Sequence, residues 1–414
     1  MKKRVGIIGG GAAGLFTACQ FSRLSDRRDI EVTVIEKNAE AGKKLTLTGH
    51  GRCNITNRKM PSELKNGFHE AKNFIYPALN SYGPEDTIAF FEKEVGLKLK
   101  EEENNRMFPV CDSAVKLRDE VVRYVSSRVN LICNTKVLDI KKTDTFEVST
   151  TAGNYSFDYL VLSCGGSSFP KTGSTGDSYI FAGLFGHTVV PVRSALAPVK
   201  ADDKSVLFTR NLSGVSLNAK LSLYCEGKKI SSITGEMLFA DFGLTGPAVM
   251  EISRDIPVQI NGTEIYLELD LVPSISDEQL DAELQELIKE HPDTKVSNLL
   301  SKYVPSSVAT EVTALAGDKS LYAQSLPKEI RKKIVRELKH RQIGISEVPS
   351  LEKAYVTRGG VSLKEIDRTS YQSKLVPGLY IIGEALDIDG TSGGWNLQAC
   401  MSEAFAVAKD ISNK

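Results

Sequence analysis

The sequence predicts an α/β protein in which a dinucleotide-binding domain is interrupted by an inserted antiparallel β domain. Three observations lead to this fold class. The chain opens on a buried strand, a glycine turn and a helix. From about residue 194, strand-like runs follow one another without intervening helices. From residue 379, a buried strand and an amphipathic helix return to the pattern of the opening segment.

The opening segment carries the strongest motif. An apolar run from Arg4 ends at Gly9-x-Gly11-x-x-Gly14, and residues 12–24 have the apolar spacing of a helix. In such a motif the first glycine allows a tight turn, the second lets a pyrophosphate approach the backbone, and the third lets the helix pack on the strand. The N-terminus of the helix then binds the phosphates.

A second strand ends in an acid at the spacing that this motif requires. Residues 31–36 read EVTVIE, and Glu36 lies about 20 residues after the glycines, where a carboxylate binds ribose hydroxyls. A GxGxxG alone also occurs in flexible loops, but its place between a strand and a helix predicts a dinucleotide site.

Residues 41–57 form a glycine-rich, polar stretch. Its glycines allow backbone to lie against a flat ligand, and its cations neutralise phosphates. These residues are Gly42, Gly49 and Gly51, with Lys43, Lys44 and Arg52. The alternative is a solvated loop.

The middle of the first domain alternates between helices and strands. We expect helices over 84–97 and 113–125, a short apolar connection over 106–110, and antiparallel strands over 131–140 and 145–150. A buried strand over 158–163 breaks into Gly165-Gly166, which brings the chain close to its cofactor.

The inserted segment is predicted to be an antiparallel barrel or sandwich with helices attached. Strand-like runs cover 217–224, 229–239 and 264–271, and Ser276-x-x-Gln279 forms a capping box before helical runs that extend to about 338. The basic run 328–341 has no interleaved aromatic residues, which favours a solvated helix face over an RNA-binding patch. The predicted domains are 1–193 with 345–414, 194–275 with 335–344, and a helical insert over 276–334.

The C-terminal segment points to FAD rather than NAD. The strand that ends at Gly383 is followed by Glu384 and Asp387, acids suited to the polyol of a ribityl chain. A second helix N-terminus, at residues 395–398, would stabilise negative charge on a reduced flavin ring, a site that NAD does not need. The alternative is a helix that only closes the core.

Composition narrows the remaining possibilities. Fifty-two basic and fifty-two acidic residues cancel, so no global field attracts nucleic acid or an anionic membrane. No apolar run reaches the length of a membrane span. The seven scattered cysteines lack CxxC or metal-ligand spacing, which favours a cytoplasmic protein without a metal site or a dithiol redox centre.

Several long motifs resemble the bacterial flavoprotein family typified by YhiN and BaiN, also called the aminoacetone-oxidase family of FAD-binding enzymes. The matching stretches run nearly end to end and read GGGAAG, GKKLTLTGHGRCNITN, MFPVCDSA, CGGSSFPKTGSTGD, LFADFGLTGPAV, VTRGGVSLKEID and SKLVPGLYIIGEALDIDGTSGGWNLQA. The resemblance implies a two-part FAD domain of the glutathione-reductase type, interrupted by a barrel-like domain that carries a small helical insert.

The resemblance also implies roles for single residues. It assigns Gly9, Gly11, Ala12, Ala13 and Gly14 to the pyrophosphate, Glu36 and Lys37 to the ribose, and Val137 to the adenine. It places Lys43, Gly51, Arg52, Cys53 and Asn54 along the flavin, Asp387 on the ribityl chain, and Gly394, Trp395, Asn396, Leu397 and Gln398 at the pyrimidine edge. The sequence departs from the family at His50, usually glycine, and at Trp395, usually tyrosine. Small residues of the last helix are partly replaced, by Glu403 and Ala408.

The expected activity is that of an FAD-dependent oxidoreductase acting on a small or sterol-like molecule. Family members are assigned reduction of an enone in bile-acid precursors and oxidation of an amino ketone by oxygen. Because a second GxGxxG is absent, either NADH or NADPH docks transiently or an organic substrate donates the hydride. The candidate catalytic residues are His50, Cys53 and Trp395. The alternatives are an amine or amino-ketone oxidase, an NAD-only dehydrogenase, and a flavin-bound scaffold or nucleic-acid-associated protein.

Overall fold

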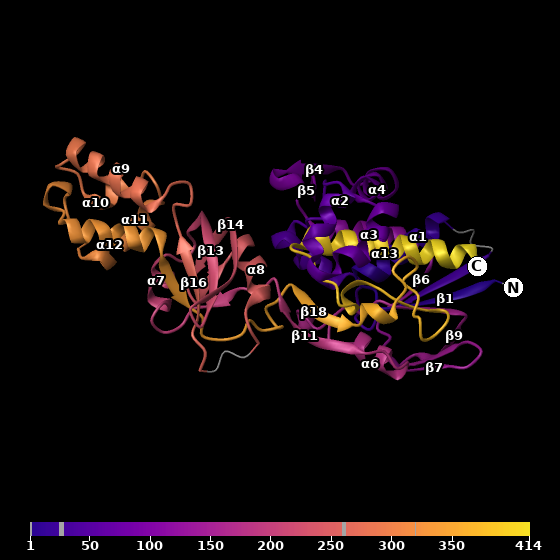
Figure 1. The fold of residues 1–414 in the computed structure, drawn as a ribbon. Coiled ribbons are helices and arrows are strands. Elements are labelled where there is room, and N and C mark those ends of the chain that lie inside the picture. The colour runs from indigo at the N-terminus through magenta and orange to yellow at the C-terminus, as the bar shows by residue number, and fades with distance from the viewer. Residues whose placement is uncertain (1, 25–28, 259–261, 319) are drawn as a thin grey trace. The chain divides into compact units, whose positions relative to one another are not determined.

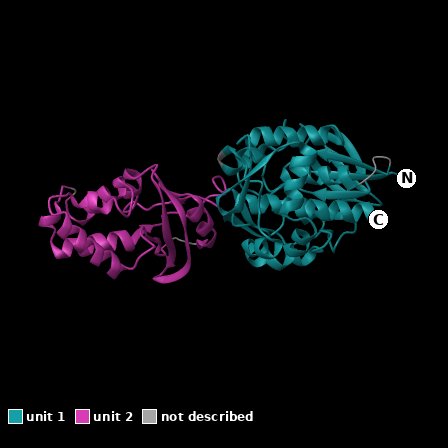
Figure 2. Cartoon of the chain, turned by 90° about the horizontal axis from the view of Figure 1, so that it is seen from above, with its two compact units in different colours: residues 1–194, 355–414 teal, residues 195–354 magenta. Residues whose placement is uncertain are grey.

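The chain forms two compact units (Figures 1 and 2). The computed structural model describes residues 2–24, 29–258, 262–318 and 320–414. Unit 1 consists of Met1–Ser194 and Tyr355–Lys414, and unit 2 is the continuous segment Ala195–Ala354. Within the described ranges, no helix has both the length and the apolar character needed to cross a membrane.

Unit 1 is built on a parallel sheet of five strands. The strand order is β19-β10-β1-β2-β6, and each neighbouring pair is parallel. The strands are β1 (Lys3–Ile8), β2 (Ile30–Ile35), β6 (Asn130–Ile132), β10 (Tyr159–Leu162) and β19 (Leu379–Ile381). The aliphatic side chains of β1, β2, β10 and β19 are almost completely buried, as expected of a sheet covered on both faces, whereas those of the edge strand β6 are half-buried.

Two long helices from opposite ends of the sequence pack together in unit 1. Helix α1 (Ala12–Leu24) connects β1 to β2, and α13 (Gly393–Asn413) follows β19. The two helices lie side by side, and α13 also contacts α3 (Lys72–Ser81) (Figure 1). This packing joins the N-terminal and C-terminal parts of unit 1 into one core.

Smaller elements complete unit 1. Two three-stranded antiparallel sheets comprise β3 (Thr56–Asn57), β5 (Arg106–Pro109) and β4 (Leu99–Glu102), and β7 (Val137–Lys142), β8 (Phe146–Thr150) and β9 (Gly153–Phe157). Other helices of unit 1 include α2 (Pro61–Leu64), α4 (Pro84–Phe90), α5 (Ala114–Ser126), α6 (Asp177–Leu184) and the 3-10 helix η1 (Lys43–Gly51). The chain leaves through β11 (Val189–Ala195) and returns in β18 (Val356–Val361), which form a two-stranded sheet.

Unit 2 contains a six-stranded antiparallel sheet of order β12-β15-β14-β13-β16-β17. Its strands are β12 (Val199–Lys200), β13 (Ser216–Cys225), β14 (Lys228–Ala240), β15 (Gly243–Thr245), β16 (Ile265–Asp270) and β17 (Arg341–Gly344). An antiparallel bridge between Ala201 and Ile345 connects the two edges of this sheet. The edges are held there by hydrogen bonds from the Asp202 N–H to the Gly344 carbonyl, 2.8 Å, and from the Ser346 N–H to the Lys200 carbonyl, 3.1 Å.

The helices of unit 2 share one apolar core with this sheet. They are α7 (Val206–Asn211), α8 (Pro247–Ile252), α9 (Asp277–Glu290), α10 (Val296–Leu300), α11 (Ser306–Ala316) and α12 (Lys328–Lys339). The predicted capping box is present at the start of α9, where Ser276 Oγ accepts from the Gln279 N–H and Gln279 Oε1 accepts from the Ser276 N–H.

The structure differs from the sequence prediction at four places. Residues 131–140 belong to two strands, β6 and β7, in different sheets, and residues 106–109 form strand β5 instead of a connection. The predicted domain boundaries assign residues 335–339 to the β domain, but these residues lie in α12, as the helical run predicted to about 338 indicates, because Ile334, Val335 and Leu338 bury one helical face. The chain returns to unit 1 at Tyr355 rather than at residue 345, because Ile345 is still paired with Ala201.

Candidate functional site

The turn between β1 and α1 gives its three glycines different roles. Gly9 has a φ of +102°, and its N–H donates to the Ile35 carbonyl at 2.8 Å. A Cβ on Gly14 would lie 1.9 Å from the Gly9 carbonyl oxygen, so this contact requires glycine. A Cβ on Gly11 would meet no described atom within 4 Å. Gly11 therefore exposes backbone at the N-terminus of α1, where free N–H groups and the helix dipole favour a phosphate.

Glu36 lies against the same turn. Its carboxylate follows directly after β2, is 7% exposed, and accepts from the N–H groups of Gly10 and Asn38, each at 2.7 Å. The Gly42 N–H donates to the Gly10 carbonyl at 2.7 Å, which brings the start of the glycine-rich stretch to this turn. A buried acid and two glycine segments thus meet at the carboxyl ends of β1 and β2, the edge at which such sheets bind ligands.

Two further glycine turns occupy this edge of the sheet. Gly165, with a φ of +76°, follows β10, and Gly383, with a φ of +69°, follows β19. A Cβ on Gly383 would lie 2.8 Å from the Cβ of Ala13, so the turn after β19 closely approaches the first residues of α1. Parts of the sequence that are hundreds of residues apart therefore converge at one place.

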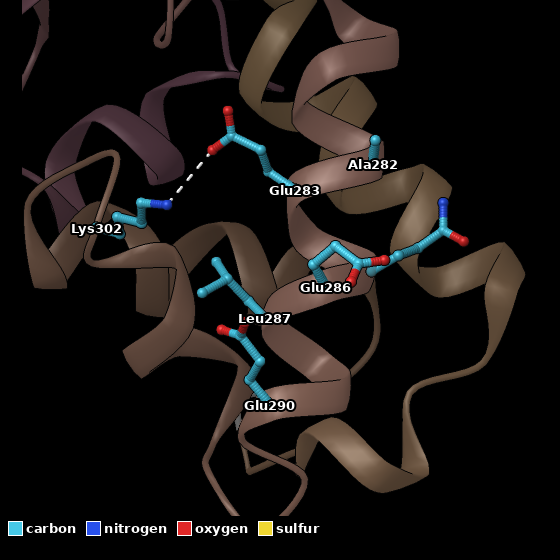
Figure 3. Close-up of a pocket in the computed structure, with 7 residues that line it drawn as sticks. Ala282, Glu283, Glu286, Leu287, Glu290 and Lys302 are labelled. Atoms are coloured by element: carbon cyan, nitrogen blue, oxygen red, sulfur yellow. Dashed lines mark hydrogen bonds and ion pairs between the residues drawn. The ribbon is translucent and has the colours of Figure 1, made fainter.

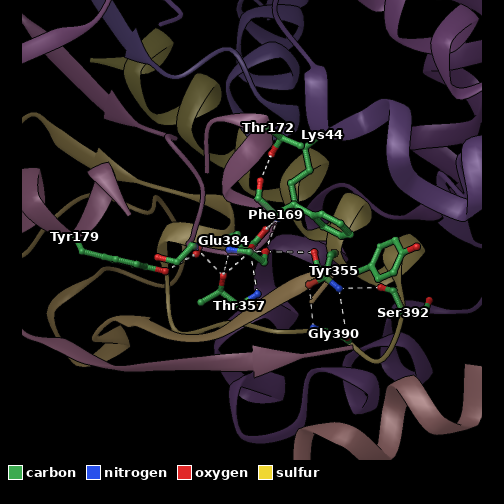
Figure 4. Close-up of polar contacts among 12 residues, drawn as sticks. Lys44, Phe169, Thr172, Tyr179, Tyr355, Thr357, Glu384, Gly390 and Ser392 are labelled. Atoms are coloured by element: carbon green, nitrogen blue, oxygen red, sulfur yellow. Dashed lines mark hydrogen bonds and ion pairs between the residues drawn. The ribbon is translucent and has the colours of Figure 1, made fainter. Parts of the chain in front are cut away.

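A charged cluster lies next to these turns (Figure 4). We call Lys44, Ser168, Thr357 and Glu384 the Lys44–Glu384 cluster. The Lys44 ammonium donates to Glu384 Oε2 at 2.7 Å and to Ser168 Oγ at 2.6 Å. Glu384 Oε1 accepts from Ser168 Oγ at 2.5 Å and from the Thr357 N–H and hydroxyl at 2.9 and 2.8 Å. The charged side chains remain 23% and 19% exposed, so the cluster is accessible to a ligand.

An aromatic pair adjoins the cluster. The rings of Phe169 and Tyr355 meet edge to face with centroids 5.0 Å apart, and both residues are half-buried (Figure 4). Phe169 has a φ of +49°, a conformation that is strained for a bulky side chain. Such strain is frequent at functional sites, where the surrounding structure holds a residue in place.

The N-terminus of α13 offers a second open helix end. A Cβ on Gly393 would meet no described atom within 4 Å, whereas a Cβ on Gly394 would lie 2.6 Å from the Asn54 side-chain amide. Two buried oxygens, Asn54 Oδ1 and Ser392 Oγ, have no hydrogen-bond partner among the described residues. Buried polar atoms are normally paired. These two fit a ligand that carries hydrogen-bonding groups along one edge.

Neither Trp395 nor Cys53, the two predicted catalytic residues whose side chains the structure describes, presents a reactive group. The indole N–H of Trp395 donates to the Leu64 carbonyl at 2.8 Å, and its ring packs against Gly67. Cys53 is completely buried, and burial raises the pKa of its thiol to about 12, so the thiol stays protonated at neutral pH. The side chain of His50 lies outside the described residues.

Several predicted cofactor residues are tied to other parts of unit 1. The Arg52 guanidinium pairs with Glu102 and Asp112, and the Lys37 ammonium lies 2.7 Å from Asp177. The Asn396 side chain bonds to the backbone of Gly390 and Ser392, and Gln398 bonds to Thr56, Tyr82 and Ser402. These side chains shape the loops around the site rather than pointing freely toward a ligand.

The remaining predicted residues differ in how far they are exposed to solvent. Lys43 and Gly51 are exposed, whereas Val137 and Leu397 are buried in the core. Asp387 is half-buried, and burial together with Asp389 raises the pKa of its carboxyl above the usual value. Four residues of the site were not predicted from the sequence. Ser168 and Phe169 lie inside the motif CGGSSFPKTGSTGD, Thr357 lies inside VTRGGVSLKEID, and Tyr355 directly precedes that motif.

A separate pocket lies in unit 2 (Figure 3). It has a volume of about 500 Å³ and is lined by Ala282, Glu283, Gln285, Glu286, Leu287, Glu290 and Lys302. The Lys302 ammonium is 3.4 Å from Glu283. Its three glutamates would repel the phosphates of a dinucleotide, so the turns of unit 1 are the better candidate site.

The whole chain matches one family model. The model is described as the HI0933-like protein Rossmann domain, and the match covers residues 3–410. The chain belongs to this family. The match confirms the resemblance found in the sequence and the Rossmann-type α/β fold of unit 1.

Curated relatives of this HI0933-like chain cover nearly its full length. A protein of Clostridium scindens named 3-dehydro-bile acid delta(4,6)-reductase is 29% identical, with 99% of each chain covered. A protein of Haemophilus influenzae named ribosomal RNA dihydrouridine synthase is 28% identical, with 99% of this chain and 98% of the relative covered. A solved flavocytochrome c3 fumarate reductase superposes with a TM-score of 0.49 at 16% identity, over 100% of this chain and 78% of that one.

Proposed function

We propose that the protein is an FAD-dependent oxidoreductase. The observation that carries this proposal is the pair of open helix N-termini, at Gly11 and at Gly393, on one Rossmann-type unit. One end suits a pyrophosphate and the other suits the pyrimidine edge of a flavin. Bound FAD supplies the hydride chemistry, and the protein supplies position and electrostatics.

The chain offers a group for each part of this cofactor. The backbone at Gly11 would bind the pyrophosphate, and Glu36, beside Gly10, would bind the adenosine ribose. Asp387 and the turn at Gly383 would hold the ribityl chain. Asn54, whose buried Oδ1 has no partner among the described residues, would bind the flavin edge.

The reaction we propose is reduction of a C=C bond conjugated to a carbonyl group. This two-electron reduction adds a hydride to the β-carbon and a proton to the α-carbon, and the carbonyl oxygen carries the negative charge in between. The Lys44 ammonium has three donors and uses two of them, on Glu384 and Ser168. Its third donor would stabilise that oxygen, as an oxyanion-hole donor does.

Two groups of substrates share this chemistry. One is a small or sterol-like enone, and the reductase named for bile acids is a relative over the full length. The other is uracil in RNA, whose ring C=C bond is conjugated to a carbonyl, and relatives named ribosomal RNA dihydrouridine synthase also match over the full length. The half-buried aromatic pair Phe169 and Tyr355 would pack against a flat ring of either kind.

Anaerobic half-reactions test the proposed reaction. The FAD-loaded protein is mixed with NADH or NADPH, and the visible flavin band is followed until it bleaches. A steroid enone or a uridine-containing RNA is then added to the reduced protein. Recovery of the band with the enone supports the first substrate, and recovery with RNA supports the second. Recovery with oxygen alone would favour an oxidase, and a flavin that neither nucleotide reduces would favour an organic hydride donor or a scaffold.

We also propose a barrel for unit 2. Its two sheet edges are connected by the Ala201–Ile345 bridge, which supports a closed rather than an open sheet. The helices over 277–339 would then form an insert in this barrel, between β16 and β17.

A further inference from the structure

Glu403 is a buried acid in the middle of α13. Its side chain is fully buried, and Oε2 accepts a hydrogen bond from the Gly383 N–H at 2.5 Å. Oε1 has no hydrogen-bond partner among the described residues. Burial of a carboxyl group lowers the stability of a fold unless hydrogen bonds compensate for it. Within the described part of the chain, Glu403 has only one such bond, from a backbone N–H, so its burial requires an explanation.

The hydroxyl of Tyr371 is a second unpaired polar group near Glu403. Tyr371 is fully buried, its hydroxyl has no partner among the described residues, and its φ is +63°, which is strained for tyrosine. The Ile381 N–H donates to the Tyr371 carbonyl at 3.2 Å, which places Tyr371 beside β19. Burial and the neighbouring Glu403 carboxyl raise the pKa of Tyr371 well above its usual value.

Glu403 carries its proton at neutral pH. Burial raises the pKa of its carboxyl to about 8. Besides the Gly383 N–H, two titratable groups face Glu403: the Tyr371 hydroxyl, beside β19, and the Cys400 thiol, one turn earlier on α13. The Cys400 thiol also interacts with the charges of Glu384 and Lys44. A neutral Glu403 can hold the Gly383 N–H without placing a second negative charge near Glu384.

The Gly383 N–H belongs to the turn that shapes the candidate site. This turn, Gly383–Ala385, presents the Glu384 carboxylate to Lys44, and a Cβ on Gly383 would lie 2.8 Å from Ala13 and 3.7 Å from the Cys400 sulfur. The turn is therefore fixed on one side by α1 and on the other by α13.

We propose that Glu403 is a positioning residue for the flavin site, because its bond to the Gly383 N–H fixes the turn that holds Glu384 and Lys44 in place. The inference rests on the proposed function, since it requires that FAD binds at this turn.

FAD binding by Glu403→Gln and Glu403→Met variants tests the inference. Glutamine keeps an acceptor for the Gly383 N–H, whereas methionine has a similar size and none. The dissociation constant of FAD is measured by titration between pH 6 and 9.5. We expect Glu403→Gln to bind within about twofold of wild type at pH 7, and Glu403→Met to bind about tenfold more weakly, as for a lost buried hydrogen bond.

The pH profile adds a second readout. Wild-type affinity should fall as the pH rises through about 8, where Glu403 ionises against the turn that carries Glu384, and Glu403→Gln should show no such fall. Equal affinity of Glu403→Met and wild type, or the same pH profile in Glu403→Gln, would overturn the inference alone. If Glu403→Met does not fold, the comparison of pH profiles decides. A wild-type protein that binds no FAD would overturn the proposed function, and this inference with it.

Discussion

At the scale of single residues, the candidate site depends on charged groups that neutralise one another. Glu384 receives donors from Lys44, Ser168 and Thr357, so a half-buried carboxylate is fully satisfied and rigid. Rigid donors favour catalysis, because they do not have to reorient when charge develops on a substrate.

Substitution of Lys44 by methionine should reduce turnover strongly. The variant keeps most of the side chain's length but removes the ammonium that we place beside the substrate carbonyl. We expect kcat to fall by about 10²-fold, as for loss of an oxyanion donor. The measurement is reoxidation of the reduced flavin by an enone under single-turnover conditions. Lys116→Met, at an exposed lysine of α5, is the control and should behave as wild type, and an equal loss in both variants would contradict this role.

Cys53 should not react with a thiol reagent in the folded protein. It is completely buried and its pKa is raised to about 12, whereas Cys111 is exposed. Iodoacetamide at pH 8, followed by peptide mass spectrometry, should modify Cys111 at once and Cys53 only after unfolding. Rapid modification of Cys53 would show that its thiol is reactive and would restore Cys53 as a candidate catalytic residue.

Glu403 should make stability depend on pH in a defined direction. Its pKa is raised from about 4.5 to about 8 by burial, so the folded protein holds a proton that the unfolded chain loses. The bound proton stabilises the folded protein fully below pH 4.5. This stabilisation declines as the pH rises toward 8 and is absent above that pH.

The comparison with Glu403→Gln isolates this effect. The free energy of unfolding of wild type minus that of the variant should fall by at most about 1.4 kcal/mol per pH unit within this window. Urea unfolding at pH 5, 6, 7 and 8 measures the difference. A constant difference would mean that Glu403 is ionised throughout.

At the scale of elements, strand ends and helix starts create the site. β1, β10 and β19 all end at glycine turns on one edge of the sheet, and α1 and α13 both begin there. The sequence predicts this well, because a buried strand that ends in glycine before a helix has few other interpretations. Residues 12–24 are helical as predicted.

Pairing partners are harder to predict than the strands themselves. The alternating run 131–140 looks like one strand, yet Asn134 adopts a φ of +53° and its N–H bonds to Asn38, so the chain changes sheets there. In the same way, Ser168, Thr357 and Glu384 meet only in the folded chain. No local sequence pattern predicts that the hydroxyls of Ser168 and Thr357 bind a carboxylate.

Two alanine substitutions in the first turn should separate folding from cofactor binding. Gly14→Ala places a Cβ about 1.9 Å from the Gly9 carbonyl and should destabilise unit 1 by more than about 3 kcal/mol. Gly11→Ala meets no described atom within 4 Å and should fold normally. It should nevertheless bind FAD at least about tenfold more weakly, because its methyl group would stand where the pyrophosphate lies.

Thermal unfolding without FAD and FAD titration measure the two effects. Normal FAD affinity in Gly11→Ala would place the pyrophosphate elsewhere. A Gly14→Ala variant as stable as wild type would contradict the tight packing of α1 on the turn.

At the scale of the whole molecule, a Rossmann-type unit is interrupted by an antiparallel unit. The sequence reveals the interruption because the alternation of helices and strands stops near residue 194 and resumes at a buried strand. The return point is less visible. Ile345 and the residues up to Ala354 still belong to unit 2, and no composition change marks that boundary.

The central claim is that unit 1 binds FAD, and the visible absorption spectrum of the purified protein tests it most directly. The spectrum is recorded as isolated and again after incubation with FAD and removal of the excess. We predict a flavin spectrum that corresponds to one FAD per chain in wild type and to less FAD per chain in Gly11→Ala, which binds FAD more weakly. A folded wild-type protein that stays colourless and takes up no FAD would contradict the claim.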